Sequence, residues 1–192
     1  MLDKLSFDNI FIPRKLDEIE EKEKTRIQKI LQQEIIEGDL DLRGINWIED
    51  LGNIREVKGD LYLNDSSIKS LGNLEKVEGS LWLENTSIQS LGNLRYVGGS
   101  LWLQNTPIQS LGNLKYVGRS LYLQNTPIQS LGNLEYVGGY LYLQNTPIQS
   151  LGNLEYVRKD LYLQNTPLSK LPKEELNKIL SKIEIRRKVY VK

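Results

Sequence analysis

The feature that most constrains this chain is a sequence repeat with a period of 20 residues. The segment LWLQNTPIQSLGNLKYVG at 101–118 returns as LYLQNTPIQSLGNLEYVG at 121–138 and as LYLQNTPIQSLGNLEYVR at 141–158. Looser copies begin at residues 40, 61 and 81, and a half copy ends at residue 172. A fixed period of this length is typical of a solenoid, in which each turn buries its apolar side chains by stacking on its neighbours.

The spacing of apolar residues changes within one repeat. Leu101 and Leu103 alternate with other residues, which predicts a short strand with one buried face. Leu111, Leu114 and Val117 then recur every three residues, which predicts a 3₁₀-like or irregular arc. Each coil is therefore expected to contain a strand, a turn, an arc and a turn back, and stacked coils are expected to form a parallel sheet on one side.

These residues resemble the leucine-rich-repeat superfamily, whose pattern is L-x-x-L-x-L-x-x-N-x-L. The nearer likenesses are the 20-residue bacterial type and the L-domain-like solenoids. The resemblance covers residues 38 to about 172 and implies a right-handed repeat solenoid of about seven coils with a 3₁₀ or irregular convex side. The turn Asn, such as Asn105, comes two residues after the second strand Leu rather than three, so we expect a tighter corner.

Both ends of the chain differ from the repeat, and we expect helical caps there. Residues 1–37 contain 16 charged residues, and six apolar residues fall largely on one helical face: Leu16, Ile19, Ile27, Ile30, Leu31 and Ile35. Residues 172–192 begin with a proline and place Leu176, Ile179, Leu180 and Ile183 at helical spacing, before a tail that can add a strand. The predicted organisation is an N-terminal cap at 1–37, a solenoid at 38–171 and a C-terminal cap and tail at 172–192. The alternative for both helices is partner binding.

The strand residues between the buried leucines point outward, and stacking turns each position into a column. The central column is an aromatic ladder that runs over about 24 Å. Its rings are Tyr62, Trp82, Trp102, Tyr122, Tyr142 and Tyr162. One flanking column contains Glu84, Gln104, Gln124, Gln144 and Gln164, and the other contains mainly Asp and Ser together with Tyr140.

Two interpretations of the ladder stay open from the sequence. Exposed Tyr and Trp offer a large contact area at low entropic cost, which favours binding. Aromatic rings one strand apart also stack on each other, which favours a structural role. The outward positions are as uniform as the inward ones, which indicates recent duplication, a periodic ligand or plain stacking. A second column on the arc side, Tyr96, Tyr116, Tyr136 and Tyr156, is predicted to be structural.

The composition argues against several classes of function. The chain has 25 basic and 25 acidic residues, so binding driven by nucleic-acid phosphates or membrane lipid is not expected. His and Cys are absent, which removes the usual general base, thiolate ligands and imidazole ligands. Asp60 and Asp65 border the aromatic face, but no cleft is predicted around them. We therefore expect no enzyme activity, no cofactor and no metal, and the lack of a signal pattern predicts a cytoplasmic protein.

The sequence thus predicts a protein-recognition module that uses the aromatic ladder, with an unidentified protein as its partner. A carbohydrate-binding module is the first alternative, because a row of rings can match a sugar chain. A structural spacer or a self-associating subunit is the second alternative. Near-identical copies are compatible with a bacterial or phage gene that expanded recently, and also with a consensus-type design.

Overall fold

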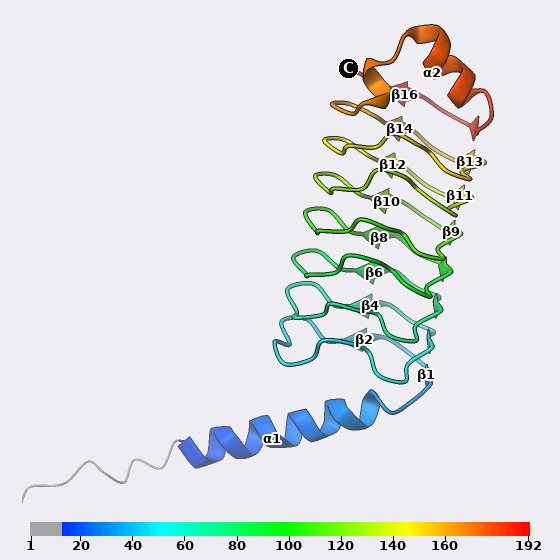
Figure 1. Cartoon of the computed structure of the whole chain (residues 1–192). Helices are drawn as coiled ribbons and strands as arrows, with labels where there is room; N and C mark the ends of the chain where they lie inside the picture. The colour runs from blue at the N-terminus through cyan, green and yellow to red at the C-terminus, as the bar shows by residue number, and fades with distance from the viewer. Residues whose placement is uncertain (1–12) are drawn as a thin grey trace, which may run out of the picture.

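The computed structural model describes residues 13–192 and has the repeat architecture that the sequence predicts (Figure 1). The chain forms a parallel β-solenoid of about six turns of 20 residues with a helix at each end. This agrees closely with the prediction of about seven coils. Residues 1–12 of the predicted N-terminal cap lie outside the described residues.

Every coil contributes one two-residue strand to each of two parallel sheets. The ladder sheet carries the predicted aromatic column and consists of β2 (Leu40–Asp41), β4 (Leu61–Tyr62), β6 (Leu81–Trp82), β8 (Leu101–Trp102), β10 (Leu121–Tyr122), β12 (Leu141–Tyr142), β14 (Leu161–Tyr162) and β16 (Val189–Tyr190). The second sheet consists of β1 (Ile35–Ile36), β3 (Glu56–Val57), β5 (Lys76–Val77), β7 (Tyr96–Val97), β9 (Tyr116–Val117), β11 (Tyr136–Val137), β13 (Tyr156–Val157) and β15 (Glu184–Ile185).

The second sheet lies where the sequence predicted an irregular arc. Val117 is fully buried while the neighbouring Tyr116 is half-buried, so this short segment also alternates between inside and outside. The backbone N–H of Gly118 donates to the carbonyl of Val97 in the previous coil at 2.8 Å. Neighbouring coils thereby satisfy backbone groups that an irregular arc would leave without regular partners.

The core is a single stack of apolar side chains between the two sheets. Leu101 and Leu103 are both fully buried, as their alternation predicts, and their counterparts in other coils are buried too. Leu111 and Leu114 complete the same layer at no more than 2% exposure. Each coil therefore covers the apolar face of the next one, which is what a repeat solenoid requires.

Two corners in each coil use residues with positive φ. Asn105 has φ +60° directly after the ladder sheet, and Gly112 has φ +58° before the second sheet. The hydroxyl of the buried Thr106 donates to the carbonyl of Leu103 at 2.6 Å and closes the first corner. Asn tolerates the left-handed region better than most residues, which explains why it stands at this position.

The two ends are covered to different extents. Helix α1 (Pro13–Ile30) meets the first coil at its C-terminal end, where Ile27 is 3% exposed, and the helix extends away from the stack, where Ile19 is 59% exposed (Figure 1). The side chain of Leu16 lies outside the described residues. At the other end, η1 (Leu168–Lys170) and α2 (Lys173–Leu180) lie over the last coil, and Leu176 of α2 is buried.

The sheets reach into both segments that the sequence predicts as caps. β1 begins at Ile35, and the C-terminal tail supplies β15 and β16, one strand for each sheet. Within residues 13–192, neither helix has the length and apolar character needed to cross a membrane.

Candidate binding face

The ladder sheet brings all six predicted aromatic residues into one column. The parallel register pairs Tyr62 with Trp82, and each following ring with the ring 20 residues later. The column also continues to Tyr190 on β16, which pairs with Tyr162 and which the sequence analysis did not include. Val189 and Tyr190 occupy the places of Leu161 and Tyr162, so the tail repeats the strand pattern without the rest of the coil.

The rings of this column stack on one another along the solenoid. Neighbouring centroids are 4.3–5.4 Å apart and neighbouring planes differ by 3–13° from Tyr62 to Tyr190. Each inner ring therefore has a neighbour against both of its faces. What the column presents outward is a row of ring edges with hydroxyl and indole N–H groups.

Three tyrosines of the column have hydroxyl groups with raised pKa values. Burial, followed by the neighbouring tyrosines, raises the pKa of Tyr142 to about 12. Burial also raises the pKa of Tyr62 and of Tyr162, in both cases with a further contribution from a nearby Asp. These three phenols therefore stay protonated at neutral pH, and the hydroxyl of Tyr62 already donates to Asp60 Oδ2 at 3.2 Å.

The two ends of the column differ from its middle. At the N-terminal end, the guanidinium of Arg43 lies 5.0 Å from the ring centroid of Tyr62 and pairs with Asp41. Towards the C-terminal end, the ring of Tyr140 lies beside Tyr142 at 5.7 Å with a 37° tilt, and Lys159 Nζ is 4.7 Å from its centroid. Cationic side chains therefore lie against rings at both ends of the column, and Glu84 is the acidic residue beside its second rung.

The flanking column of Asp and Ser has a structural role. Its side chains accept a hydrogen bond from the backbone N–H at the same position of the next coil. Asp60 accepts from Ser80 at 2.6 Å, Ser80 from Ser100 at 3.1 Å, and Ser120 from Tyr140 at 3.1 Å. Tyr140 interrupts this series with a ring in place of the small acceptor.

The column of Glu84 and the four glutamines contains buried acceptors. Gln104 Nε2 donates to Glu84 Oε1 at 3.1 Å. Among the described residues, one oxygen of each member is buried without a hydrogen-bond partner, and these are Glu84 Oε2 and the Oε1 atoms of Gln104, Gln124, Gln144 and Gln164. Burial is the main cause that raises the pKa of Glu84.

The chain has no match among protein-family models, curated proteins or solved structures.

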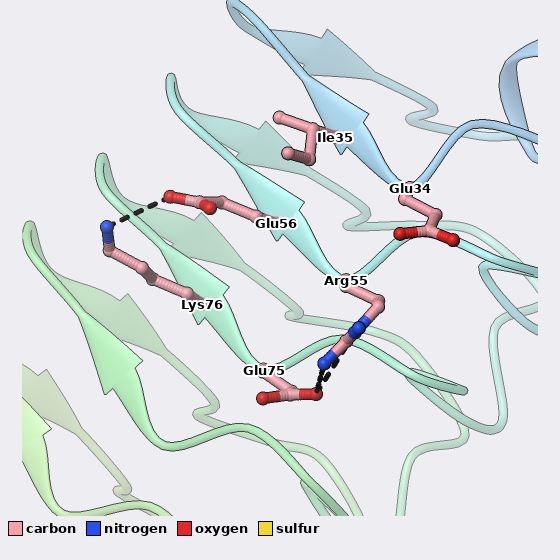
Figure 2. A pocket seen from close by; sticks show the side chains of 6 residues that line it. All are labelled: Glu34, Ile35, Arg55, Glu56, Glu75 and Lys76. Carbon is pink, nitrogen blue, oxygen red and sulfur yellow. Dashed lines mark hydrogen bonds and ion pairs between the residues drawn. The ribbon is translucent and has the colours of Figure 1, made fainter.

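The outer surface of the second sheet is built differently along its length. Tyr96, Tyr116, Tyr136 and Tyr156 stack at 4.6–5.0 Å, as the prediction of a structural column requires. In the coils nearer the N-terminus, charged side chains replace these rings around a shallow pocket of about 290 Å³ (Figure 2). Its lining residues are Glu34, Ile35, Arg55, Glu56, Glu75 and Lys76.

Ion pairs engage four of the five charged side chains that line this pocket. Arg55 pairs with Glu75 at 2.7 Å and Lys76 with Glu56 at 2.9 Å (Figure 2). Hydrogen bonding to Arg55 lowers the pKa of Glu75, so this carboxylate is held ionised. Exposed pairs of this kind are screened by solvent and add little stability, and we interpret them as the local substitute for ring stacking.

The two acids that border the ladder face are already engaged. Asp60 accepts from the Ser80 backbone and from the Tyr62 hydroxyl at 3.2 Å. Hydrogen bonds from the amides of Asn85 and Asn64 lower the pKa of Asp65. Within residues 13–192, no group of three or more acidic residues lies close enough together to hold a metal ion.

Proposed function

We propose that this chain is a non-catalytic protein-recognition module of the leucine-rich-repeat type, and that the outer face of the ladder sheet is its binding surface. The observation that carries the proposal is the continuous row of aromatic edges from Tyr62 to Tyr190 on the outer face of the ladder sheet. Aromatic groups with a polar handle are enriched at protein interfaces.

The support for leucine-rich-repeat kinship is the strand Leu101-x-Leu103 followed by an Asn at a tight corner. The second sheet and the earlier position of that Asn are departures from the pattern. The proposed cytoplasmic location rests on the lack of a signal pattern in the sequence and stays a prediction.

A structural role is the second candidate, because stacking already occupies both faces of every inner ring. Offset stacked pairs contribute about 0.5–1.5 kcal/mol each, so the column stabilises the solenoid whether or not it binds a partner. The carbohydrate alternative has less support, because a sugar stacks on ring faces and this column presents ring edges.

A matched pair of variants separates binding from stacking. Tyr122→Ala removes a ring that stacks at 5.4 and 4.9 Å in the ladder sheet, and Tyr116→Ala removes one that stacks at 4.9 and 4.6 Å in the second sheet. We expect both variants to lose about 1–3 kcal/mol of unfolding free energy, because each loses two stacking contacts.

The binding measurement is a pull-down from host lysate with the three immobilised proteins, combined with a glycan array. We expect proteins that are retained by the wild type and by Tyr116→Ala but lost with Tyr122→Ala. Equal retention by all three proteins would assign the column to stacking alone. Signals on the glycan array that depend on Tyr122 would favour the carbohydrate alternative.

A further inference from the structure

The bends that join the second sheet to the ladder sheet form a ridge along one edge of the ladder face. We call this the corner ridge, and it consists of residues 37–39, 58–60, 78–80, 98–100, 118–120, 138–140, 158–160 and 186–188. Its charge is strongly polarised along the solenoid. The first three bends contain four acidic residues and one Lys, whereas the last four contain six basic residues and one Asp.

The ladder face beside this ridge has a fixed period. Its rungs follow the strand spacing of about 4.8 Å, and the same residue types recur on successive rungs. A surface that repeats in this way makes equivalent contacts along its whole length only with a partner of the same period. Another copy of this chain has that period, and identical arrays of this kind can pack face to face with little water between them.

We propose that the ladder face is a homodimer interface in which two copies pack face to face and antiparallel about a two-fold axis. This inference rests on the proposed function, since it requires the ladder face to bind protein. An axis that lies in the contact plane and runs along the strands turns one solenoid end for end and keeps its corner ridge on the same side. The acidic end of one ridge then faces the basic end of the other, twice in each dimer.

The charges that meet in this arrangement are exposed. Glu37 and Asp39 lie in the first bend, and Arg187 and Lys188 lie in the last bend beside Tyr190. A parallel face-to-face pair has its axis along the solenoid and places the two ridges at opposite edges of the interface, so their charges would not meet. Charges at the rim of an interface act mainly on association rate and orientation, so the ridge favours the antiparallel arrangement.

The size of the face suits a reversible dimer. Eight strands at about 4.8 Å and about six residues across at 3.3 Å give roughly 760 Å² of flat area in each copy. Standard interfaces bury about 800 Å² on each partner, and weaker assemblies bury less. We therefore expect monomer and dimer to exchange with protein concentration.

The test uses charge reversal at the two ends of the ridge, measured by sedimentation equilibrium over a concentration series. The first variant, Arg187→Glu with Lys188→Glu, changes the net charge of the last bend, residues 186–188, from +3 to −1. The second variant, Glu37→Lys with Asp39→Asn, removes the acidic end and keeps the acceptor that bonds the Asp60 backbone N–H. Each variant alone is expected to raise the dimer dissociation constant at least about tenfold, and an equimolar mixture is expected to restore dimerisation.

Two controls complete the design. Tyr122→Ala removes a central ring and is expected to weaken the dimer, whereas Tyr116→Ala on the second sheet is expected to leave it unchanged. Circular dichroism melting of every variant checks that each remains folded at the measurement temperature. Raising the ionic strength is expected to weaken the wild-type dimer, because it screens the ridge charges.

The outcomes separate this inference from the proposed function. A wild type that stays monomeric at all concentrations overturns the dimer, and Tyr122-dependent capture of another protein would still support the recognition module. Variants that dimerise as well as the wild type, or a mixture that stays monomeric, overturn the antiparallel arrangement. Dimerisation that is insensitive to Tyr122→Ala overturns the choice of face.

Discussion

Both sheets carry an outward column of aromatic rings, but the residues that lie beside the rings differ between the two sheets. In the second sheet, the ring of Tyr96 covers Gly98, since a Cβ built on this glycine would lie 3.2 Å from the ring. The same holds for Tyr136 over Gly138, at 3.1 Å. In the ladder sheet, the residue two positions after each inner ring is Gln or Glu.

In the second sheet, most coils that have a tyrosine ring also have a glycine two positions later. Coils with Tyr116 or Tyr136 have a glycine two positions later, whereas the coils with Glu56 and Lys76 have Lys58 and Glu78 there. Tyr156, followed by Arg158, is the exception near the C-terminal end. The tyrosine rings of the second sheet therefore cover backbone at glycine residues. This structural role supports assigning the proposed binding surface to the ladder sheet alone.

The largest expected effect tests whether the second sheet requires glycine where its coils approach closely. A Cβ at Gly118 would lie 2.1 Å from the carbonyl oxygen of Gly98, whereas one at Gly38 would have open space around it. Gly118→Ala is expected to lower the free energy of unfolding by about 2–4 kcal/mol, and Gly38→Ala to change it little. Urea unfolding followed by circular dichroism measures both variants. Equal losses would contradict the idea that close approach of the coils requires glycine in the second sheet.

The corner after the ladder sheet gives the next largest effect. Asn145 has φ +58°, donates to Asn125 Oδ1 at 2.9 Å and accepts from Asn165 Nδ2 at 2.9 Å. Asn145→Ala loses both side-chain bonds and places a Cβ in the left-handed region, for an expected loss of about 1–3 kcal/mol. Asn145→Gly is expected to lose less in the same urea experiment, because glycine adopts this φ freely. A glycine variant as unstable as the alanine variant would show that the amide bonds alone matter.

The sequence alone predicted one of the two sheets and missed the other. The 20-residue period and the alternation at Leu101 and Leu103 were enough to predict the solenoid and the outward column. The apolar residues that end at Val117 recur every three positions, which predicted an arc and not a strand. The second sheet was therefore missed, although Tyr116 and Val117 alternate between outside and inside. Pairing between coils is a tertiary interaction, and two-residue strands leave little local pattern.

The candidate site was predictable in composition and position, but its ring orientation was not. Rings one strand apart can present faces or edges to solvent, and the choice depends on side-chain rotamers set by neighbouring coils. Tyr190 was missed because its strand lies outside the repeat, although Val189-Tyr190-Val191 matches the pattern of Leu161-Tyr162-Leu163. The tail was predicted only to add a strand, without a register.

The third expected effect is smaller and concerns how tyrosines of the two columns change the stability of the fold at alkaline pH. The pKa of Tyr142 is about 12, against about 10 for an ordinary tyrosine, and burial also raises the pKa of Tyr116. Above pH of about 10 the unfolded chain loses these protons first, so stability is expected to fall as pH rises. Tyr142→Phe is expected to reduce this fall more than Tyr116→Phe, in thermal melts on either side of that pH. An equal reduction would mean that the two columns are equally shielded.

The smallest expected effect concerns Glu84, the acidic member of the glutamine column. Burial raises the pKa of its carboxyl group, so ionisation costs more in the folded chain than in the unfolded one. Its contribution to stability therefore decreases as pH rises from the unfolded pKa, about 4.3, through the higher folded value. Glu84→Gln keeps the acceptor for Gln104 Nε2 and removes the charge, so we expect a small gain in unfolding free energy at neutral pH, limited because solvent screens this half-buried group.

The pH dependence distinguishes this cause from a general improvement in packing. Below pH of about 4 the carboxyl group is protonated in both states, so the gain from Glu84→Gln should largely disappear. The reverse change, Gln104→Glu, places a second carboxyl group in the same column and is expected to lose stability only at neutral pH. Urea unfolding at the two pH values measures both variants. A gain for Glu84→Gln that persists in acid would assign the effect to packing, and the charge of Glu84 would then have no part in setting the stability of the ladder face.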